Sequence, residues 1–209
     1  MKKQDNVKEV WNMAINLVGD CELQTVSGKQ RISGFDCGNE ELNDFFNKKS
    51  LPFKEQLLAM TCFLRHKESG KTVCAFSLSP NALKATDLPG SRRKKVREYI
   101  PHEKTLQSYP AFLIGRLGVS LEFNGQGVGT QLMDFVKTYC IGNYPDFCRF
   151  LVIDAYNSPS VLNFYYKNNF STVFSTEEQE RKAYKIRPEE VLQTRYLFYD
   201  MIHWRDGNY

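Results

Sequence analysis

The residues whose types and spacing suggest chemistry are the glycines between Asn124 and Gly129. Glycine occupies every second position in the run Asn-Gly-Gln-Gly-Val-Gly. The apolar stretch 111–119 comes before it and predicts a buried strand. Apolar residues then recur at helical spacing from Val128 onward, which predicts an amphipathic helix. Because glycine has no Cβ and the first N–H groups of a helix lack partners, this stretch predicts a phosphate-binding turn.

The spacing does not fit two well-known phosphate-binding motifs. A dinucleotide-binding fold requires G-x-G-x-x-G directly after the first strand, whereas this run reads G-x-G-x-G and lies in the middle of the chain. A P-loop requires lysine after its last glycine, but Gly129 is followed by Thr130.

The stretch resembles motif A of the GCN5-related N-acetyltransferases, whose pattern is Q/R-x-x-G-x-G/A. Gly127, Val128 and Gly129 match its last three positions, and Asn124 stands where the family has Gln or Arg. The upstream "RLGV" and the downstream "FYYKNNF" strengthen the resemblance. It implies that the turn binds the pyrophosphate of acetyl-CoA, the cosubstrate, and that no metal is needed.

The resemblance also implies a set of residues that contact acetyl-CoA. They are Leu117, Val119, Asn124, Gly125, Gln126, Gly127, Val128, Gly129, Thr130, Asn157 and Tyr165.

Acetyl transfer from a thioester to an amine needs a donor to the carbonyl, a base for the amine proton and an acid for the thiolate. The resemblance implies that the backbone N–H of Val119 is the donor and that Tyr165 is the acid. Tyr166 is the nearest competitor, and either tyrosine could be a packing residue. No base is assigned, because Glu122 and Asp154 lie near the right strands but are more typical of exposed carboxylates. The absence of a Ser-His-Asp or Cys-His spacing favours direct transfer in a ternary complex.

Other positions leave alternatives open. Gly118 fits either a strand bulge, as the family has here, or a close approach by a bulky neighbour, and the glycine turn that follows favours the bulge. Asn157 resembles the asparagine that contacts the pantetheine arm, but Ser158 stands at the family's usual spacing from the tyrosine. Asn157 could also cap the next helix. Asn169 stands where the family has glycine and tolerates the left-handed conformation.

The remaining pattern predicts an α/β chain with the acyl-CoA N-acyltransferase fold of this family, a mixed central sheet flanked by helices. We expect an N-terminal extension at 1–22, then one acetyltransferase domain at 23–209 that contains a long 81–110 connection. The expected strands are 23–26, 61–65, 72–79, 111–119, 150–155, 171–174 and 195–201. The expected helices are a short one within 1–20, one at 40–46, one from 128 and one at 159–168, with 175–190 a loop or short helix.

The composition fits a reduced, cytoplasmic chain with no membrane partner. The net charge is +4, no apolar run reaches the ~20 residues of a membrane span, and the six cysteines form no C-x-x-C pair. The 42% hydrophobic content is sufficient for a core. Cys62 and Cys74 lie in apolar runs and are expected to be buried thiols.

Two features bear on the partner. "FDCGNEELNDFF" resembles the opening of a subgroup that includes the acetyltransferase toxins of toxin–antitoxin pairs, which modify aminoacyl-tRNA. The basic run 92–95 with Arg97 fits RNA, an acidic substrate or a solvated face. The expected function is transfer of acetyl from acetyl-CoA to an amine acceptor. A toxin acting on aminoacyl-tRNA, a non-catalytic module that binds CoA or a partner, and a homodimer remain open alternatives.

Overall fold

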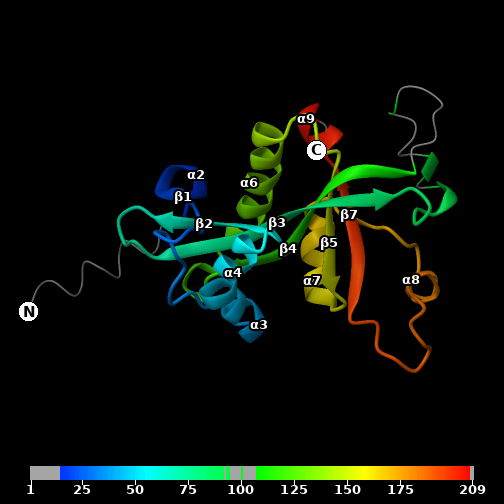
Figure 1. The fold of residues 1–209 in the computed structure, drawn as a ribbon, viewed down its shortest axis with the longest axis horizontal. Helices are drawn as coiled ribbons and strands as arrows, with labels where there is room; N and C mark the ends of the chain where they lie inside the picture. Colours follow the sequence, from blue (N-terminus) through cyan, green and yellow to red (C-terminus); the bar gives the residue numbers. More distant parts are fainter. Residues whose placement is uncertain (1–14, 92, 95–99, 101–106, 208–209) are drawn as a thin grey trace, which may run out of the picture. The chain divides into compact units, whose positions relative to one another are not determined.

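The computed structural model describes residues 15–91, 93–94, 100 and 107–207, and its strands form one mixed sheet. In this described part the strand order is β1-β2-β3-β4-β5-β7-β6 (Figure 1). The strands are β1 Cys21–Thr25, β2 Met60–His66, β3 Thr72–Lys84, β4 Ser108–Val119, β5 Phe150–Tyr156, β6 Ser171–Thr172 and β7 Thr194–Asp200. The β4–β5 pair is parallel, whereas β1–β2, β5–β7 and β6–β7 are antiparallel, so the predicted mixed sheet is confirmed.

The described helices include both predicted and unpredicted segments. They are α2 Leu17–Asp20, α3 Glu40–Asp44, the π-helix η1 Phe45–Lys49, α4 Ser50–Glu55, the 3₁₀ turn η2 Leu121–Phe123, α6 Val128–Asn143, α7 Pro159–Lys167, α8 Glu177–Tyr184 and α9 Met201–Arg205. The helix expected within 1–20 is seen only as α2, because residues 1–14 lie outside the described part.

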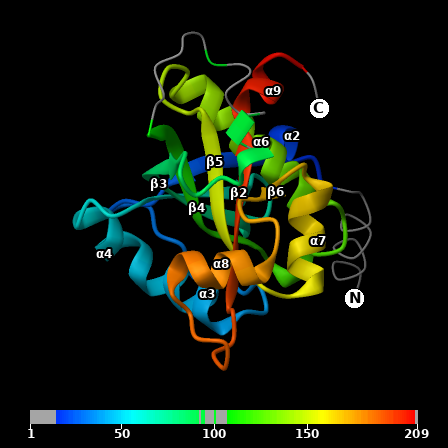
Figure 2. The ribbon, with the colours of Figure 1, turned by 90° about the vertical axis from the view of Figure 1, so that its right-hand side faces the viewer.

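The chain divides into two compact units. The first comprises Met1–Ser77 and Arg116–Val136, and the second comprises Leu78–Gly115 and Lys137–Tyr209. Figure 2 shows α7 in yellow and α8 in orange, both of which belong to the second unit.

An aromatic core fills the first unit beneath α3, η1 and α4. Phe35, Phe45, Phe46 and Phe63 are buried there, and the rings of Phe35, Phe45 and Phe46 meet edge to face. Each such ring pair adds about 0.5–1.5 kcal/mol beyond the area that it buries. Above this core the helix changes register, because the Ser50 N–H donates to the Phe45 carbonyl in the π-helical pattern.

The π-helix has a physical reason in the sequence. Pro52 has no N–H, so it can give no α-helical bond to the Lys48 carbonyl. The register change places Pro52 in the first turn of a new helix, α4, where a missing N–H is tolerated. The predicted helix 40–46 therefore continues to Glu55 as three joined segments.

The core of the second unit lies on one face of β4, β5 and β7. It includes Ala111, Phe150, Val152 and Tyr196, and Val173 and Leu83 pack into the same cluster. An ion pair between Arg149 and Asp200, 2.8 Å apart, joins the start of β5 to the end of β7.

Several predicted boundaries were wrong. β3 extends to Lys84 and β4 begins at Ser108, so the connection between them is 85–107 rather than 81–110. β3 therefore runs through Pro80. Asp200 ends β7 because its side chain accepts the Ile202 N–H at 3.1 Å and caps α9, which the sequence did not predict.

The remaining boundary differences are smaller. β1 lies at 21–25 rather than 23–26, and β6 covers only 171–172 of the expected 171–174. The six cysteines are free, and Cys62 and Cys74 are fully buried, as predicted. Within the described ranges, no helix has both the length and the apolar character that crossing a membrane would require.

Candidate functional site

The glycine turn lies between η2 and the start of α6 in the first unit. Gly125 and Gly127 both have φ of 76°, a left-handed backbone that side chains with a Cβ rarely adopt. A Cβ built on either glycine would meet no atom within 4 Å. These glycines are therefore required by the backbone and not by packing, and the space in front of the turn is open.

The first turn of α6 has backbone N–H groups without partners inside the helix. The helix makes its first bond from the Gln131 N–H to the Gly127 carbonyl, at 3.2 Å. The N–H groups of Val128, Gly129 and Thr130 come before that bond and have no partner inside the helix. Aligned peptide dipoles make this end of a 16-residue helix attractive to an anion.

Asn124 shapes the turn from within. Its Oδ1 accepts the N–H of Gly125 at 2.9 Å. The side chain that departs from the family pattern therefore stabilises the first left-handed glycine. Gln131 holds the helix start from the other side, because its side chain accepts the Leu17 N–H at 3.0 Å and donates to the Ile15 carbonyl at 2.8 Å.

The end of β4 leads into this turn. Leu117 and Val119 are half-buried, and Gly118 between them is buried. A Cβ at Gly118 would lie 3.3 Å from the Cys37 Sγ and 3.4 Å from a ring carbon of Phe35. Close approach by these neighbours is therefore sufficient to explain the glycine. The role of the Val119 N–H as carbonyl donor stays a prediction.

The chain just after β4 is held by backbone bonds within the first unit. The Ser120 N–H donates to the Val73 carbonyl at 2.8 Å, and the Leu121 N–H donates to the Asp36 carbonyl at 2.9 Å. Asp36 belongs to the "FDCG" sequence, and its carboxylate accepts the Gly38 N–H and an Asn43 N–H. This motif therefore positions the segment from which the glycine turn begins.

Tyr165 lies on α7 in the second unit. Its ring is 8% exposed and contacts Phe164 and Phe170 edge to face, with centroids 5.1 and 5.7 Å apart. Burial raises the pKa of Tyr165 to about 12, so its hydroxyl is protonated at neutral pH, as in an exposed tyrosine, but is a weaker acid. Tyr166 is 42% exposed, so the two tyrosines face different environments. The helix is followed by Asn169 at φ 66°, which confirms the predicted left-handed residue.

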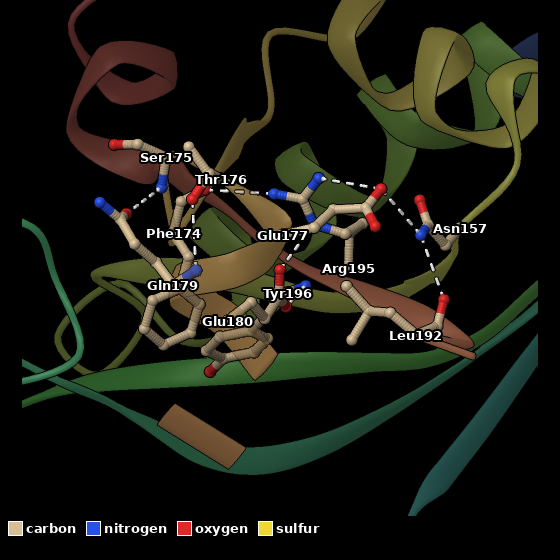
Figure 3. A network of polar contacts seen from close by, with 10 residues as sticks. All are labelled: Asn157, Phe174, Ser175, Thr176, Glu177, Gln179, Glu180, Leu192, Arg195 and Tyr196. Atoms are coloured by element: carbon tan, nitrogen blue, oxygen red, sulfur yellow. Dashed lines mark hydrogen bonds and ion pairs between the residues drawn. The ribbon is translucent and has the colours of Figure 1, made fainter. Parts of the chain in front are cut away.

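Asn157 connects elements of the second unit. Its Nδ2 donates to Glu177 Oε1 and to the Leu192 carbonyl, both at 3.1 Å (Figure 3). The N-cap of α7 is Ser158, and its side chain makes no capping bond. The alternative in which Asn157 caps the helix was therefore wrong. Its contact with the pantetheine arm stays a prediction.

A buried ion pair near Asn157 was not predicted from the sequence. Glu180 on α8 is 1% exposed, and its carboxylate accepts from Arg195 Nε and from the Tyr196 N–H, each at 2.6 Å (Figure 3). Arg195 also donates to the Phe174 carbonyl at 3.3 Å. In the sequence, Glu180 is one acid among several in a charged helix. Such a pattern is also typical of a helix whose charges are all solvated, so it did not indicate a buried ion pair.

The two carboxylates considered as a base are both exposed. Glu122 pairs with Lys71 at 2.7 Å, and both side chains are about half exposed. Asp154 lies opposite Tyr196 in the β5–β7 pair. Protein atoms around the Asp154 carboxylate reduce its hydration, and this partial burial raises the pKa of Asp154.

The residues predicted to contact acetyl-CoA fall in both units. Leu117 to Thr130 form one continuous segment of the first unit, whereas Asn157 and Tyr165 belong to the second. In the basic run, Arg93 donates to the carbonyls of Thr86 and Leu88, and Lys94 is exposed. Arg92, Lys95 and Arg97 lie outside the described residues. Within the described part, no three His, Cys, Asp or Glu side chains gather as a metal site.

Comparison with solved structures gives the class of fold. No family model matches the sequence. The structure matches the acetyltransferase toxins KacT and AtaT over nine-tenths of its length, so the chain has the fold of the GCN5-related N-acetyltransferases.

Three individual matches illustrate this similarity. A tyrosine-to-phenylalanine variant of KacT superposes with a TM-score of 0.69 and is 20% identical, covering 90% of this chain and 99% of KacT. AtaT complexed with acetyl-methionyl-tRNAfMet gives a TM-score of 0.63 at 18% identity, covering 90% of this chain and 99% of that one. AtaTR bound with acetyl-CoA gives 0.61 at 15% identity, covering 90% and 98%.

Proposed function

We propose that this protein transfers the acetyl group of acetyl-CoA directly to the amino group of an aminoacyl-tRNA. The observation that carries the proposal is the turn at Asn124–Thr130. There, two left-handed glycines leave open space in front of the first N–H groups of α6. A pyrophosphate group needs such a site, and acetyl-CoA, the cosubstrate, carries a pyrophosphate.

The choice of acceptor is supported by what similar folds bind. One solved structure holds AtaT complexed with acetyl-methionyl-tRNAfMet, and another holds AtaTR bound with acetyl-CoA. The sequence "FDCGNEELNDFF" also resembles the toxin subgroup, and the chain carries a net charge of +4. AtaT further binds the C-terminus of the antitoxin AtaR. We therefore infer an antitoxin as the regulatory partner of this chain.

The proposed chemistry assigns one role to each residue. The amine nitrogen attacks the thioester carbonyl carbon, while the Val119 N–H donates a hydrogen bond to the carbonyl oxygen. The carbon–sulfur bond then breaks, and the thiolate takes a proton from Tyr165, whose hydroxyl is protonated at neutral pH. The amine loses its own proton to a base that we leave unassigned. No covalent enzyme intermediate is required.

The experiment is a comparison of acceptors with one acetyl-CoA donor. The purified protein is incubated with acetyl-CoA and charged tRNA, uncharged tRNA, peptides or small amines, and the acetylated product is identified by mass spectrometry. We expect acetylation of charged tRNA only. Acetylation of peptides or amines in preference to charged tRNA would contradict the acceptor. Binding of acetyl-CoA without consumption in any reaction would favour a non-catalytic module.

A further inference from the structure

A pocket of about 290 Å³ opens in the first unit between the segment after β1 and the helix η1–α4. Val26 and Ile32 line its bottom but are only 1% and 2% exposed, so they offer a ligand almost no surface. Leu51 is partly buried and Pro52 is exposed, and both line the pocket. These two side chains can pack against a ligand.

Hydrogen bonds hold the walls of this pocket in place. Lys54 Nζ on α4 donates to the Val26 carbonyl at 2.7 Å, and the Val26 N–H donates to the Thr61 carbonyl of β2 at 2.9 Å. Ser27 and Gln30 exchange backbone bonds of 2.8 and 3.2 Å across a tight turn. The pocket is therefore formed before any ligand arrives, which lowers the entropy cost of binding.

The rim of the pocket is charged. Arg31 and Glu55 line it and are exposed, and no carboxylate among the described residues pairs with the Arg31 guanidinium. Lys48 also lines it, with 76% of its side chain exposed. Lys48 and Lys49 both pair with Asp44, at 3.0 and 2.6 Å, so two ammonium groups share one carboxylate. The rim thus carries more positive than negative charge.

The π-helix contributes to this arrangement. Asn47 and Lys48 are neighbours in η1, and the side chain of Asn47 turns inward to bond the N–H and carbonyl of Phe35, at 3.0 and 2.7 Å. Lys48 is left on the outer side, at the pocket. Single π-helical turns occur frequently at functional sites.

We propose that this pocket binds one nucleotide of an RNA strand. The phosphate lies between Arg31 and Lys48, the base packs on Leu51 and Pro52, and the Glu55 carboxylate accepts from an amino group of the base. A pocket of this volume lies near the lower end of the range for small-molecule sites, which suits a mononucleotide. The inference rests on the proposed aminoacyl-tRNA acceptor and adds a contact to the same partner.

The test measures binding of uncharged tRNA and of a short single-stranded RNA at several salt concentrations, without turnover. The double variant Arg31→Ser/Lys48→Ser should bind about tenfold more weakly. Loss of the contact to this one single-stranded phosphate should also flatten the slope of log affinity against log salt by about 0.7. Glu55→Gln should bind more tightly, because its amide oxygen can still accept from the base while a negative charge near the phosphate is removed. Unchanged affinity in the double variant would overturn the proposal.

Control variants and competitors distinguish a specific nucleotide pocket from a general effect of positive charge. Lys182→Ser/Lys185→Asn removes two exposed lysines around the end of α8 and should leave RNA affinity unchanged. An equal loss there would show that only net charge matters and would overturn the assignment. Adenosine monophosphate should compete at lower concentration than inorganic phosphate. Equal competition would overturn recognition of a nucleotide.

Two further readouts keep this proposal distinct from the proposed function. Acetyl-CoA affinity should be the same in Arg31→Ser/Lys48→Ser and in the parent, and a loss would assign the pocket to the cosubstrate instead. If charged tRNA is not acetylated but RNA binding still depends on Arg31 and Lys48, the proposed function fails and the pocket stands. If RNA binds without any contribution from these residues, the pocket fails and the function stands.

Discussion

At the scale of single residues, Tyr165 and Tyr166 show how one position on a helix changes the chemistry that a side chain can perform. Both carry a phenol, but the ring of Tyr165 is enclosed by Phe164 and Phe170, whereas Tyr166 is 42% exposed. Burial opposes the negative charge of a phenolate, so Tyr165 remains a proton donor over a wider pH range.

We predict that Tyr165→Phe lowers kcat about 10²–10⁴-fold and changes the KM for acetyl-CoA little. The variant removes one hydroxyl and keeps the ring, so the packing against Phe170 should survive. Steady-state kinetics with the identified acceptor measures this, and Tyr166→Phe is the matched control that should be nearly silent. Full activity of Tyr165→Phe would make Tyr165 a packing residue. A large loss in Tyr166→Phe would move the acid by one position.

The same burial predicts a pH dependence of stability. The pKa of Tyr165 is about 12 in the folded chain and near 10 when unfolded, so ionisation favours the unfolded state at high pH. The contribution is fully present below about pH 10 and is lost as the pH rises through 12. Urea unfolding should show the parent losing up to about 3 kcal/mol more than Tyr165→Phe over this range. Parallel curves for the two proteins would refute the buried hydroxyl.

At the scale of elements, the glycine turn depends on backbone conformation and α8 depends on a buried charge. The turn needs Gly125 and Gly127 because no Cβ fits a φ of 76° without strain. The N-cap of helix α8 is Thr176, whose side chain accepts the Gln179 N–H. The helix buries the side chain of Glu180. A short polar helix has little hydrophobic surface to bury, so such a contact matters more.

We predict that Gly127→Glu weakens acetyl-CoA binding more than tenfold while circular dichroism stays native. The carboxylate would enter the open space in front of α6 and repel the pyrophosphate. Gly127→Ala is the control for strain. It should cost about 1–2 kcal/mol of stability from its left-handed backbone but keep most of the affinity. Calorimetry measures both variants, and native affinity in a folded Gly127→Glu would exclude this turn as the pyrophosphate site.

We predict that Glu180→Gln destabilises the folded chain by about 3–5 kcal/mol. It leaves the guanidinium of Arg195, which is only 8% exposed, with Glu177 as its remaining acid at 4.0 Å. The exposed neighbour Glu178→Gln should change stability by no more than about 0.5 kcal/mol. Urea unfolding midpoints give both values. Equal stability of the two variants would show that the ion pair is energetically neutral.

At the scale of the whole molecule, positive charge is placed in two separate parts of the chain. The 92–97 run carries one group, and Arg31 with Lys48 carries another, while the net charge is only +4. Arg93 does not belong to a purely solvated face, because it holds the carbonyls of Thr86 and Leu88. A charge-removal experiment on the basic run should therefore leave Arg93 in place.

We predict that Arg92→Ser/Lys94→Ser/Lys95→Ser weakens tRNA binding and flattens its salt dependence. If this run and the pocket contact different phosphates, the slope changes should add when these substitutions are combined with Arg31→Ser/Lys48→Ser. Binding isotherms at several salt concentrations measure the slopes. A parent protein whose tRNA binding does not depend on salt would remove the physical support for an RNA partner.

Local patterns in the sequence predicted much of the fold. Helix α6, strand β5, helix α7 and the left-handed Asn169 follow from apolar spacing, Pro159 and the preferences of asparagine. These depend on neighbouring residues only, so the sequence is sufficient to predict them. The same is true of the glycine turn, because the need for a positive φ is a property of the backbone.

The tertiary structure decided the rest, because it depends on contacts between residues far apart in the chain. The extension of β3 to Lys84 depends on its pairing with β4 in the sheet. Glu180 and Arg195 are 15 residues apart and pair only because α8 packs against β7. The pocket at Arg31 and Lys48 likewise exists only where two segments meet. Burial and pairing arise from such long-range contacts, which apolar spacing along the chain cannot encode.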